Sequence, residues 1–522
     1  MMSDERDEVA RVFDLTFFKD NSSPTPITTP WHSRPIDVHR WSDHPEVEAM
    51  VQKIWNNHFA SDYPDPNKQT GPKPKRIFNQ QLRIVVLDLY VAWLEHPHLC
   101  VGVSMDVNAW HTGSRYNALH ISKKITDIIE RLRETGLIDY MGGSYSGDDG
   151  YGNHTTRIRA SKPLQAVFAA ARFSREDIVR TASQECIILK GTDDPGDNSK
   201  PVEYKDSDET NRMRAELTAY NAVLADAFID LPSLEEALIE REITTGKDTG
   251  RTAKVPLDHH HNFVRRIFSR GDWGLNGRFY GGWWQQIGSE YRSQILINDT
   301  PTVEVDFKGL HIAILSAEQG VAVEGDPYEL PPKLVPGAPP ELQRALVKAL
   351  VLTALNAPSR KSAFQSFRDG WPTGHMGKTL TNAELEGVLA AFIEKHPHLA
   401  DRVCADQGIR LMNVDSRIAE IVHRHFTAQG VPVLSVHDSY IIDYTRVLEL
   451  KQVMQHAAAE VLAVTLAVST KAAGLDEIRL STAADPDHVL DFLQWVQPPR
   501  CEGYLTRLAA WEGRKARVVV PY

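Results

Sequence analysis

The chain has 522 residues, of which 42% are hydrophobic and 24% charged, the composition of an ordinary soluble protein of two to four domains. It has no apolar run of 18 residues and a charged N-terminus, so we expect no membrane span and no signal peptide. The four widely spaced cysteines argue against a disulfide framework or a zinc site and predict a cytoplasmic protein. Because the net charge is −11, any nucleic-acid binding must depend on local basic patches.

The first predicted segment, residues 1–75, is rich in Pro, Ser, Asp and His and has little periodicity. We expect a partly irregular extension with one short helix near Val47–Phe59.

Residues 76–165 show a sharper pattern. One helix, NQQLRIVVLDLYVAWLEHP, is followed by a loop and by a second helix, SKKITDIIERLRETG, with Ser122 as its N-cap and Gly136 as its C-terminal stop. An apolar stripe runs along the second helix, and two strands, LIDYMGG and NHTTRIRAS, follow it.

This order resembles a winged helix-turn-helix, and "IIERLRETGLIDY…TTRIRAS" is similar to the last helix and wing of plasmid replication initiators. The resemblance implies a domain that binds duplex DNA. Residues 71–162 hold 12 Lys and Arg against 9 Asp and Glu, which fits that role; a winged helix used only for protein packing is the alternative. The candidate phosphate contacts are Lys123, Lys124, Arg131, Arg133, Arg157 and Arg159.

Residues 166–259 predict a helical, thumb-like connector with a polar loop near residues 190–210. Residues 260–500 mix strands and helices and form the last large unit, and residues 501–522 are a C-terminal tail.

Two apolar strands in that unit each carry an aspartate, Asp306 in VEVDFKGLH and Asp438 in LSVHDSYII. An ionised carboxylate on a buried strand costs several kcal/mol unless it is paired or holds a metal. One carboxylate on each of two adjacent strands can hold two Mg²⁺ ions about 4 Å apart, so the pair predicts a two-metal phosphoryl-transfer centre. Glu304 shares a strand face with Asp306 and is either an auxiliary acid or a solvent-facing residue.

Between these strands lies a predicted helix, ELQRALVKALVLTALNA. Arg344 and Lys348 are one helical turn apart on one face, where two cations can bind the phosphates of a nucleoside triphosphate.

The order of carboxylate strand, R-x-x-x-K helix and His-Asp strand resembles motifs A, B and C of the family A DNA polymerases and the bacteriophage-type single-subunit RNA polymerases. The similarity covers about residues 275–465. It implies an α+β fold, with a polymerase palm and helical, fingers-like insertions preceded by the winged helix.

The resemblance also implies the site. Asp306 and Asp438 would bind two Mg²⁺ ions, with Mn²⁺ as the alternative ion. Arg344 and Lys348 would stabilise the triphosphate, and His437 would orient the catalytic strand or touch the primer terminus.

Upstream of motif A, the segment GDWGLNGRFYGGWWQQIGSEYRSQILIN contains a Gly-Arg turn that resembles one in these polymerases. Arg278 and Arg292 in this segment are candidate contacts to nucleic acid. We expect its Tyr and Trp side chains either to stack on bases or to belong to the core, and aromatic clusters more often belong to the core.

The helix departs from the family pattern, because its LVLTALNA segment lacks the usual tyrosine. Asn356 lies in this segment and is a candidate contact to the nucleotide. His311, five residues after Asp306, stands where the DNA branch carries a bulky residue that excludes the 2′-hydroxyl. It modestly favours dNTPs, whereas the Asp-Ser pair of motif C resembles the RNA branch.

Three functions remain open. The first is a DNA-templated polymerase, DNA synthesis favoured, that replicates a phage, plasmid or mobile element with duplex DNA, primer-template and nucleoside triphosphates as partners. The second is a template-independent terminal transferase or primer-synthesising enzyme. The third is a catalytically inactive DNA-binding initiator or regulator.

Overall fold

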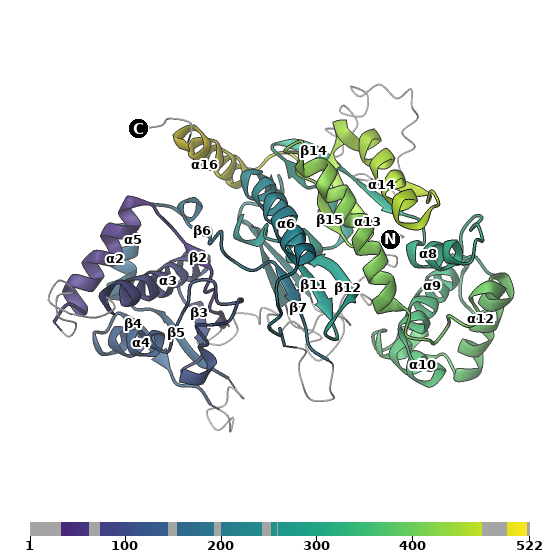
Figure 1. Ribbon diagram of the computed structural model, residues 1–522, viewed down its shortest axis with the longest axis horizontal. Coiled ribbons are helices and arrows are strands. Elements are labelled where there is room, and N and C mark those ends of the chain that lie inside the picture. Colours follow the sequence, from purple (N-terminus) through teal and green to yellow (C-terminus); the bar gives the residue numbers. More distant parts are fainter. Residues whose placement is uncertain are drawn as a thin grey trace. The chain divides into compact units, whose positions relative to one another are not determined.

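The computed structural model describes residues 33–61, 74–144, 154–192, 200–242, 252–257, 259–471 and 498–518. The fold is of the mixed α+β class (Figure 1). The described chain divides into two compact units, an N-terminal unit built on residues 33–185 and a C-terminal unit built on residues 186–242 and 255–509. Of the described helices, none is long and apolar enough to cross a membrane.

The N-terminal unit combines helices with a small sheet whose strand order is β1-β3-β5-β4. Strand β1 is parallel to β3, and the other neighbours are antiparallel. Its elements are β1 (Ser33–Pro35), β2 (Arg40–Trp41), α2 (Pro45–His58), α3 (Pro74–Glu95), β3 (Cys100–Val103), η2 (Val107–Ala109), α4 (Lys124–Glu134), β4 (Ile138–Met141), β5 (Thr156–Ala160), α5 (Lys162–Ala169), η3 (Arg175–Asp177) and β6 (Val179–Arg180).

Helix α3, strand β3, helix α4 and the β4–β5 pair follow one another in the order of a winged helix. The fully described stretch between β3 and α4 holds only the short turn η2 instead of a further α-helix. Helix α4 begins one residue later than expected, with Lys123 as its N-cap, while the Ser122 hydroxyl accepts a weak bond from the Lys124 amide at 3.4 Å. Its apolar stripe, including Ile125 and Leu132, is fully buried, because the 3.6-residue period places these side chains against α3.

Residues 33–61, which the sequence analysis assigned to an extension, contribute β1, β2 and α2 to this unit. Their attachment to α3 depends on Asp88, whose carboxylate is completely buried. Asp88 pairs with Arg34 and with Arg40, each at 2.8 Å, and accepts a hydrogen bond from the Asp37 amide. A buried carboxylate with two cations and an amide donor is compensated, so this contact ties the N-terminal strands to α3.

The C-terminal unit contains a six-stranded sheet, a three-stranded sheet and long helices (Figure 1). Its strands are β7 (Ile187–Leu189), β8 (Ile229–Asp230), β9 (Leu238–Glu242), β10 (Thr252–Pro256), β11 (Arg265–Ser269), β12 (Asp272–Tyr280), β13 (Leu296–Ile297), β14 (Thr300–Phe307), β15 (Leu434–Val436), β16 (Ser439–Asp443) and β17 (Val468–Lys471). Its helices are α6 (Asp208–Asp226), η4 (His259–His261), η5 (Trp283–Gln286), α7 (Ser289–Arg292), α8 (Leu310–Glu318), α9 (Pro340–Asn356), α10 (Arg360–Asp369), α11 (Met376–Thr379), α12 (Asn382–Lys395), η6 (Pro397–Leu399), α13 (Gly408–Thr427), η7 (Tyr444–Arg446), α14 (Val447–Leu462) and α16 (Glu502–Val518).

Strand β14 is the centre of the six-stranded sheet. The order is β15-β16-β14-β13-β8, and β17 pairs with β14 along its second half. The alternation of the strand sequence sets its faces, since Val303, Val305 and Phe307 are at most 1% exposed and enter the core. Glu304 and Asp306 therefore share the opposite face.

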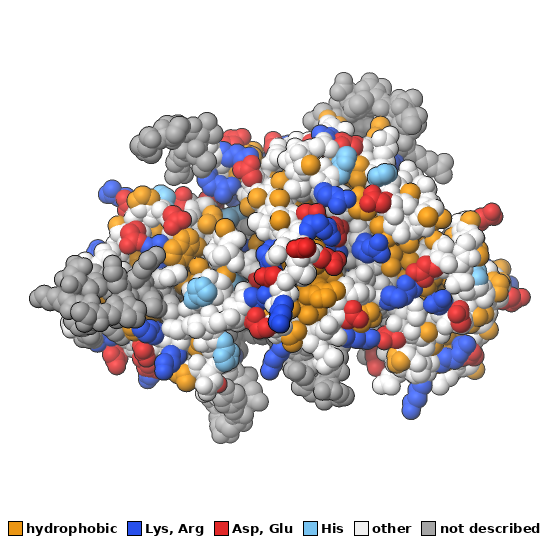
Figure 2. All heavy atoms as spheres, in the orientation of Figure 1, with side chains coloured by type: hydrophobic (Ala, Val, Ile, Leu, Met, Phe, Trp, Pro, Cys, Tyr) orange, Lys and Arg blue, Asp and Glu red, His pale blue; other side chains and the backbone are white. Residues whose placement is uncertain are grey.

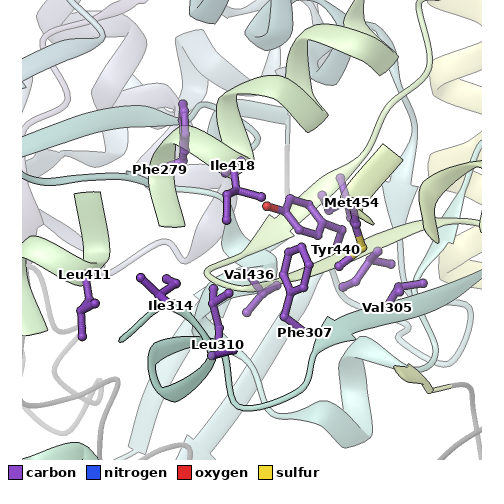
Figure 3. Packing of buried hydrophobic residues seen from close by; sticks show 14 of the residues in the cluster. Phe279, Val305, Phe307, Leu310, Ile314, Leu411, Ile418, Val436, Tyr440 and Met454 are labelled. Carbon is purple, nitrogen blue, oxygen red and sulfur yellow. The ribbon is translucent and has the colours of Figure 1, made fainter. Parts of the chain in front are cut away.

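The core beneath this sheet is continuous with the helices. Figure 3 shows Val305, Phe307 and Tyr440 from the strands facing Leu310 of α8 and Met454 of α14. Helix α13 packs along β12, and α8, α9 and α14 also contact it. On the face that Figure 2 shows, acidic and basic side chains are intermingled.

Candidate active site

Asp306 lies on β14, whereas Asp438, expected on a buried strand, lies in the turn that leads into the adjacent strand β16. Asp306 lies near the end of β14 and is paired across the ladder with Ser439, the residue that follows Asp438. The amide of Phe307 donates a hydrogen bond to the Asp438 carbonyl oxygen at 3.3 Å. Both aspartates are half-buried, so the fold brings the two carboxylate-bearing positions together at one end of the sheet.

Asp438 occupies a two-residue turn between β15 and β16. The other residue of the turn, His437, has a positive φ of 57°, which is the left-handed region that tight hairpins require. Val436 pairs with Ser439 on either side of the turn, so the backbone fixes where Asp438 leaves the sheet. Among the described residues, no hydrogen bond or ion pair engages the Asp438 carboxylate.

Glu304 is buried and fully engaged. Its carboxylate accepts a hydrogen bond from the Ser439 hydroxyl at 2.7 Å and pairs with Arg292 at 3.2 Å. Arg292 also donates to the Ile287 carbonyl oxygen at 2.9 Å. Glu304 is therefore paired on the face it shares with Asp306, and Arg292, a candidate nucleic-acid contact, is tied to that pair.

Arg278 is held inside the site. Its Nε donates to Asp415 of α13 at 2.6 Å, and its Nη2 donates to Nε2 of His311 on α8 at 3.2 Å. Burial works to lower the pKa of Arg278, but Asp415 and Asp438 raise it overall, so the cation is stabilised. The pKa of the completely buried Asp415 is raised, with burial as the largest cause.

The same contact fixes the state of His311. A guanidinium only donates hydrogen bonds, so Nε2 of His311 is an acceptor and its proton is on Nδ1. Burial, followed by the charge of Arg278, lowers the pKa of His311 to about 3, so the ring is neutral at physiological pH. Nδ1 is buried and has no hydrogen-bond partner among the described residues.

Tyr328 lies within electrostatic range of both aspartates and is hydrogen-bonded to Asp326, the ion-pair partner of Arg344. Burial raises its pKa, and the charges of Asp438, Asp326 and Asp306 raise it further, which puts all three carboxylates in its electrostatic surroundings. The Tyr328 amide donates to Asp326 at 3.0 Å, and the Asp326 carboxylate pairs with Arg344. Arg344, 43% exposed, thus already has an anionic partner.

Lys348 and Asn356 lie further along α9. Lys348 is half-buried one turn after Arg344. Asn356 is the last residue of α9 and donates to the Leu352 carbonyl oxygen at 2.7 Å, while its Oδ1 is buried without a hydrogen-bond partner among the described residues. A Cβ on Gly408, the first residue of α13, would lie 1.5 Å from that Oδ1, so the two helices meet closely here.

The candidate cations of the N-terminal unit differ in their environments. Lys123 is exposed at the start of α4, and the Lys124 ammonium lies 4.7 Å from the centre of the Phe78 ring. Arg131 donates to the His58 carbonyl oxygen at 2.7 Å. Lys123 therefore has the most solvent access of these three.

The remaining cations of this group are Arg133, which is exposed and pairs with Glu130 at 3.3 Å, and two arginines of β5. Arg157 is half-buried, and Arg159 pairs with Asp139 of β4 at 2.9 Å. Pairing with nearby carboxylates lowers the net charge that Arg133 and Arg159 offer to a phosphate.

The site offers few protein ligands to a metal ion, as Mg²⁺ sites commonly do, and does not enclose an ion with protein side chains. In the described part of the chain, no group of three or more His, Cys, Asp or Glu side chains has the geometry of a metal site. Mg²⁺ is commonly held by one or two carboxylates, with water and substrate phosphates completing its shell. Asp306 and Asp438 are the residues that would hold such an ion, whereas Arg292 and Ser439 already engage Glu304.

Sequence reasoning missed Asp415 and Tyr328. Asp415 stands in the apolar stripe of α13 with Leu411, Ile418 and Val422, all buried, and an acid in such a stripe is a detectable signal. The turn Asp326–Pro327–Tyr328 had no such signal, because its importance depends on contacts with α9.

No protein-family model and no curated protein matches the sequence. Among solved structures, the polymerase domain of Pol1 from M. smegmatis, in complex with DNA primer-template and dNTP, aligns with 50% of this chain at 11% identity. The alignment spans about half of that structure's chain, 51%, and has a TM-score of 0.26. Similarity at that level does not establish a common fold, so the site is interpreted from its own residues.

Proposed function

We propose that this protein is a nucleic-acid polymerase, a nucleotidyltransferase that uses two divalent metal ions, Mg²⁺ or Mn²⁺. The observation that carries the proposal is the pairing of β14 with β16, which joins the positions of Asp306 and Asp438 at one sheet end. Their motif order in the sequence, with the Arg344 helix between them, supports the same reaction.

The chemistry is transfer of a nucleotidyl group. The oxygen of a 3′-hydroxyl attacks the α-phosphorus of a nucleoside triphosphate, the bond to pyrophosphate breaks, and the hydroxyl proton leaves to solvent. The metal ions, when bound to Asp306 and Asp438, supply Lewis-acid stabilisation of the attacking and leaving oxygens. Arg344 and Lys348 offer positive charge to the triphosphate from one face of α9, and His437 is the other residue of the turn that carries Asp438.

The finer assignment is DNA-templated DNA synthesis, with RNA synthesis and template-free addition as the other outcomes. His311 and Asn356 are the proposed contacts to the incoming nucleotide, and Arg278 is the proposed contact to nucleic acid. The winged-helix order of the N-terminal unit supports duplex binding, and together the two units suit replication of a phage, plasmid or mobile element.

A primer-extension assay tests the reaction. The full-length protein receives Mg²⁺ or Mn²⁺ and a labelled primer, with or without template, and dNTPs or rNTPs. We expect template-dependent extension that Asp306→Asn and Asp438→Asn each abolish, because neither amide can replace the carboxylate charge. Asp443→Asn, a matched change at the far end of β16, should retain activity.

The other outcomes identify the alternatives. Extension without template indicates a terminal transferase or primer-synthesising enzyme. Duplex binding with no incorporation under any of these conditions indicates an inactive initiator. Mn²⁺ binding, measured by electron paramagnetic resonance, should weaken in both aspartate variants, which tests the metal ligands independently of activity.

Duplex binding has a separate test. Because Lys123, Lys124 and Arg157 are the proposed phosphate contacts of the winged helix, replacing all three by Ala should weaken duplex affinity and flatten its dependence on salt. Unchanged affinity would exclude this surface as the duplex site.

A further inference from the structure

Two buried ion pairs attach α13 to the β11–β12 hairpin. Arg266 of β11 pairs with Glu420 at 2.7 Å, and Arg278 of β12 pairs with Asp415 at 2.6 Å. In both pairs the arginine side chain is at most 12% exposed and the carboxylate at most 14% exposed. Both pairs join an arginine of the hairpin to a carboxylate of α13. If their function were only to stabilise the fold, the two pairs would have the same role.

Their surroundings differ. Nε of Arg266 donates to the Gly277 carbonyl oxygen and its Nη2 donates to the Ser416 hydroxyl, and Glu420 is shared with Arg212. Arg278 instead donates to His311, and the charge of Asp438 contributes to its stabilisation. Of the two pairs, the Arg278 pair is therefore the one that contacts His311 and lies within electrostatic range of Asp438.

The contacts of Arg278 leave one group available. Nε is occupied by Asp415 and Nη2 by His311, so two of its three nitrogens are fixed to helices α13 and α8. Nη1 makes no hydrogen bond to a described residue and is not among the buried polar atoms. A guanidinium held at two nitrogens is pre-organised to present the third to an anion.

We propose that Asp415 is a positioning residue of the polymerase site: it holds Arg278 so that Nη1 meets a phosphate of the nucleic acid beside Asp438. This inference rests on the proposed function. Asp415 itself touches no substrate in this scheme, because its side chain is 1% exposed and, among the described residues, it is engaged through Oδ2 by Arg278.

The test is the salt dependence of primer-template binding by the full-length protein. Removing one phosphate contact lowers the slope of log Kd against log salt by about one. We expect this loss in Arg278→Gln, in Asp415→Asn and, to the same extent, in the double variant, because both residues act through one contact. We also expect Asp415→Asn to lower kcat by roughly tenfold to a hundredfold, with a smaller change in KM for the nucleotide.

Glu420→Gln is the matched control. It breaks the Arg266 ion pair on the same helix and also weakens the contact of Glu420 with Arg212, so it should lower thermal stability at least as much as Asp415→Asn while leaving the salt slope and kcat near those of the wild type. A full wild-type slope in Asp415→Asn, or an equal loss in Glu420→Gln, overturns the proposal, since the effect would then be structural.

Arg278→Lys covers the case in which Asp415→Asn does not fold. A lysine keeps the charge opposite Asp415, but its compact ammonium lacks the planar fork whose three separated nitrogens reach Asp415, His311 and a phosphate at once. It should therefore lose the same slope while remaining folded, and an unchanged slope overturns the proposal. If the wild type binds no primer-template, the proposed function fails as well; if it binds and extends but the variants keep the slope, only the role of Asp415 fails.

Discussion

At the scale of single residues, Arg344 is a proposed triphosphate contact for which a carboxylate of the protein already competes. Its guanidinium pairs with Asp326. Burial is the largest single influence on the pKa of Asp326 and works to raise it, but the hydrogen bonds from Arg344 and the Tyr328 amide, with the charges of Arg344 and Lys395, together lower that pKa. A triphosphate that binds Arg344 must therefore replace a carboxylate. The pair is partly exposed, so its strength falls in the range of about 0.2–1 kcal/mol.

We expect Asp326→Asn to tighten nucleotide binding by about 1.4-fold to fivefold, because it frees Arg344 from an ion pair of that strength. The measurement is titration of a fluorescent nucleoside triphosphate. Asp406→Asn, which breaks the exposed pair with Arg270, is the control and should change little. Weaker binding in Asp326→Asn would mean that Asp326 holds Arg344 in place instead.

A second prediction at this scale concerns His423, which is 4% exposed and stacks on Tyr220 with ring centres 4.1 Å apart. Burial, followed by the charge of Arg266, lowers its pKa from 6.5 to about 3. The unfolded chain therefore binds this proton more readily, and the stability present above pH 6.5 is lost as the pH falls toward 3.

Between pH 7.5 and 5.5 this one group should cost about 1.4 kcal/mol of the unfolding free energy. His423→Phe keeps the ring but not the titration, so its loss over that interval should be smaller by this amount in urea unfolding. His456→Gln, an exposed histidine on α14, is the control. Equal acid sensitivity in His423→Phe and the wild type would contradict the assignment.

Single residues also show where sequence reasoning ends. The shared face of Glu304 and Asp306 follows from alternation along one strand, which the sequence states directly. The ion pairs of the site cannot be predicted in this way, because they depend on how separate elements pack. They join Arg278 to Asp415, Arg292 to Glu304 and Arg344 to Asp326.

At the scale of elements, the contact between α9 and α13 is unusually close. A Cβ on Gly408 would overlap the Asn356 side chain, so one of the two must move. We expect Gly408→Ala to destabilise the C-terminal unit by about 1–3 kcal/mol, the usual cost of overpacking. Asn356→Ala removes the obstructing amide, so the double variant should recover much of that loss in urea unfolding.

If Gly408→Ala lowers the unfolding free energy by the same amount in the wild-type and Asn356→Ala backgrounds, the strain does not arise from the contact with Asn356. Gly387→Ala, in α12, is a matched helical glycine with open space around its Cβ position, and it should be neutral or slightly stabilising.

Periodicity predicted the strongest elements well. The helix expected after Ser122, the helix carrying Arg344 and the strand carrying Asp306 are all present as α4, α9 and β14. The ladder between β14 and β16 was a hypothesis about two strands far apart in sequence, and no local pattern specifies such a pairing. The loop expected between helices α3 and α4 of the N-terminal unit is present, and it also contains the short strand β3 and the turn η2.

At the scale of the whole molecule, the N-terminal and C-terminal units have separate hydrophobic cores. We expect two transitions in calorimetry, because each core can lose its packing as one cooperative event. Asp88→Ala leaves Arg34 and Arg40 without their buried partner, which costs about 3–5 kcal/mol. It should lower the transition of the N-terminal unit alone.

Asp230→Ala provides the reciprocal test, because Asp230 is buried in the C-terminal unit and pairs with Arg507 at 2.7 Å. It should lower the other transition. If either variant shifts both transitions together, the units unfold as one.

The two edges of β14 have a mechanical consequence. At Glu304–Asp306 the strand is hydrogen-bonded to β16 on one side and β17 on the other, so it cannot slide without breaking two ladders at once. Asp438, by contrast, sits on a two-residue turn. In the proposed site, Asp306 is therefore held on a rigid strand, whereas Asp438 lies on a hairpin turn. Any change in the distance between the two carboxylates as a substrate enters and leaves must come from movement of the hairpin.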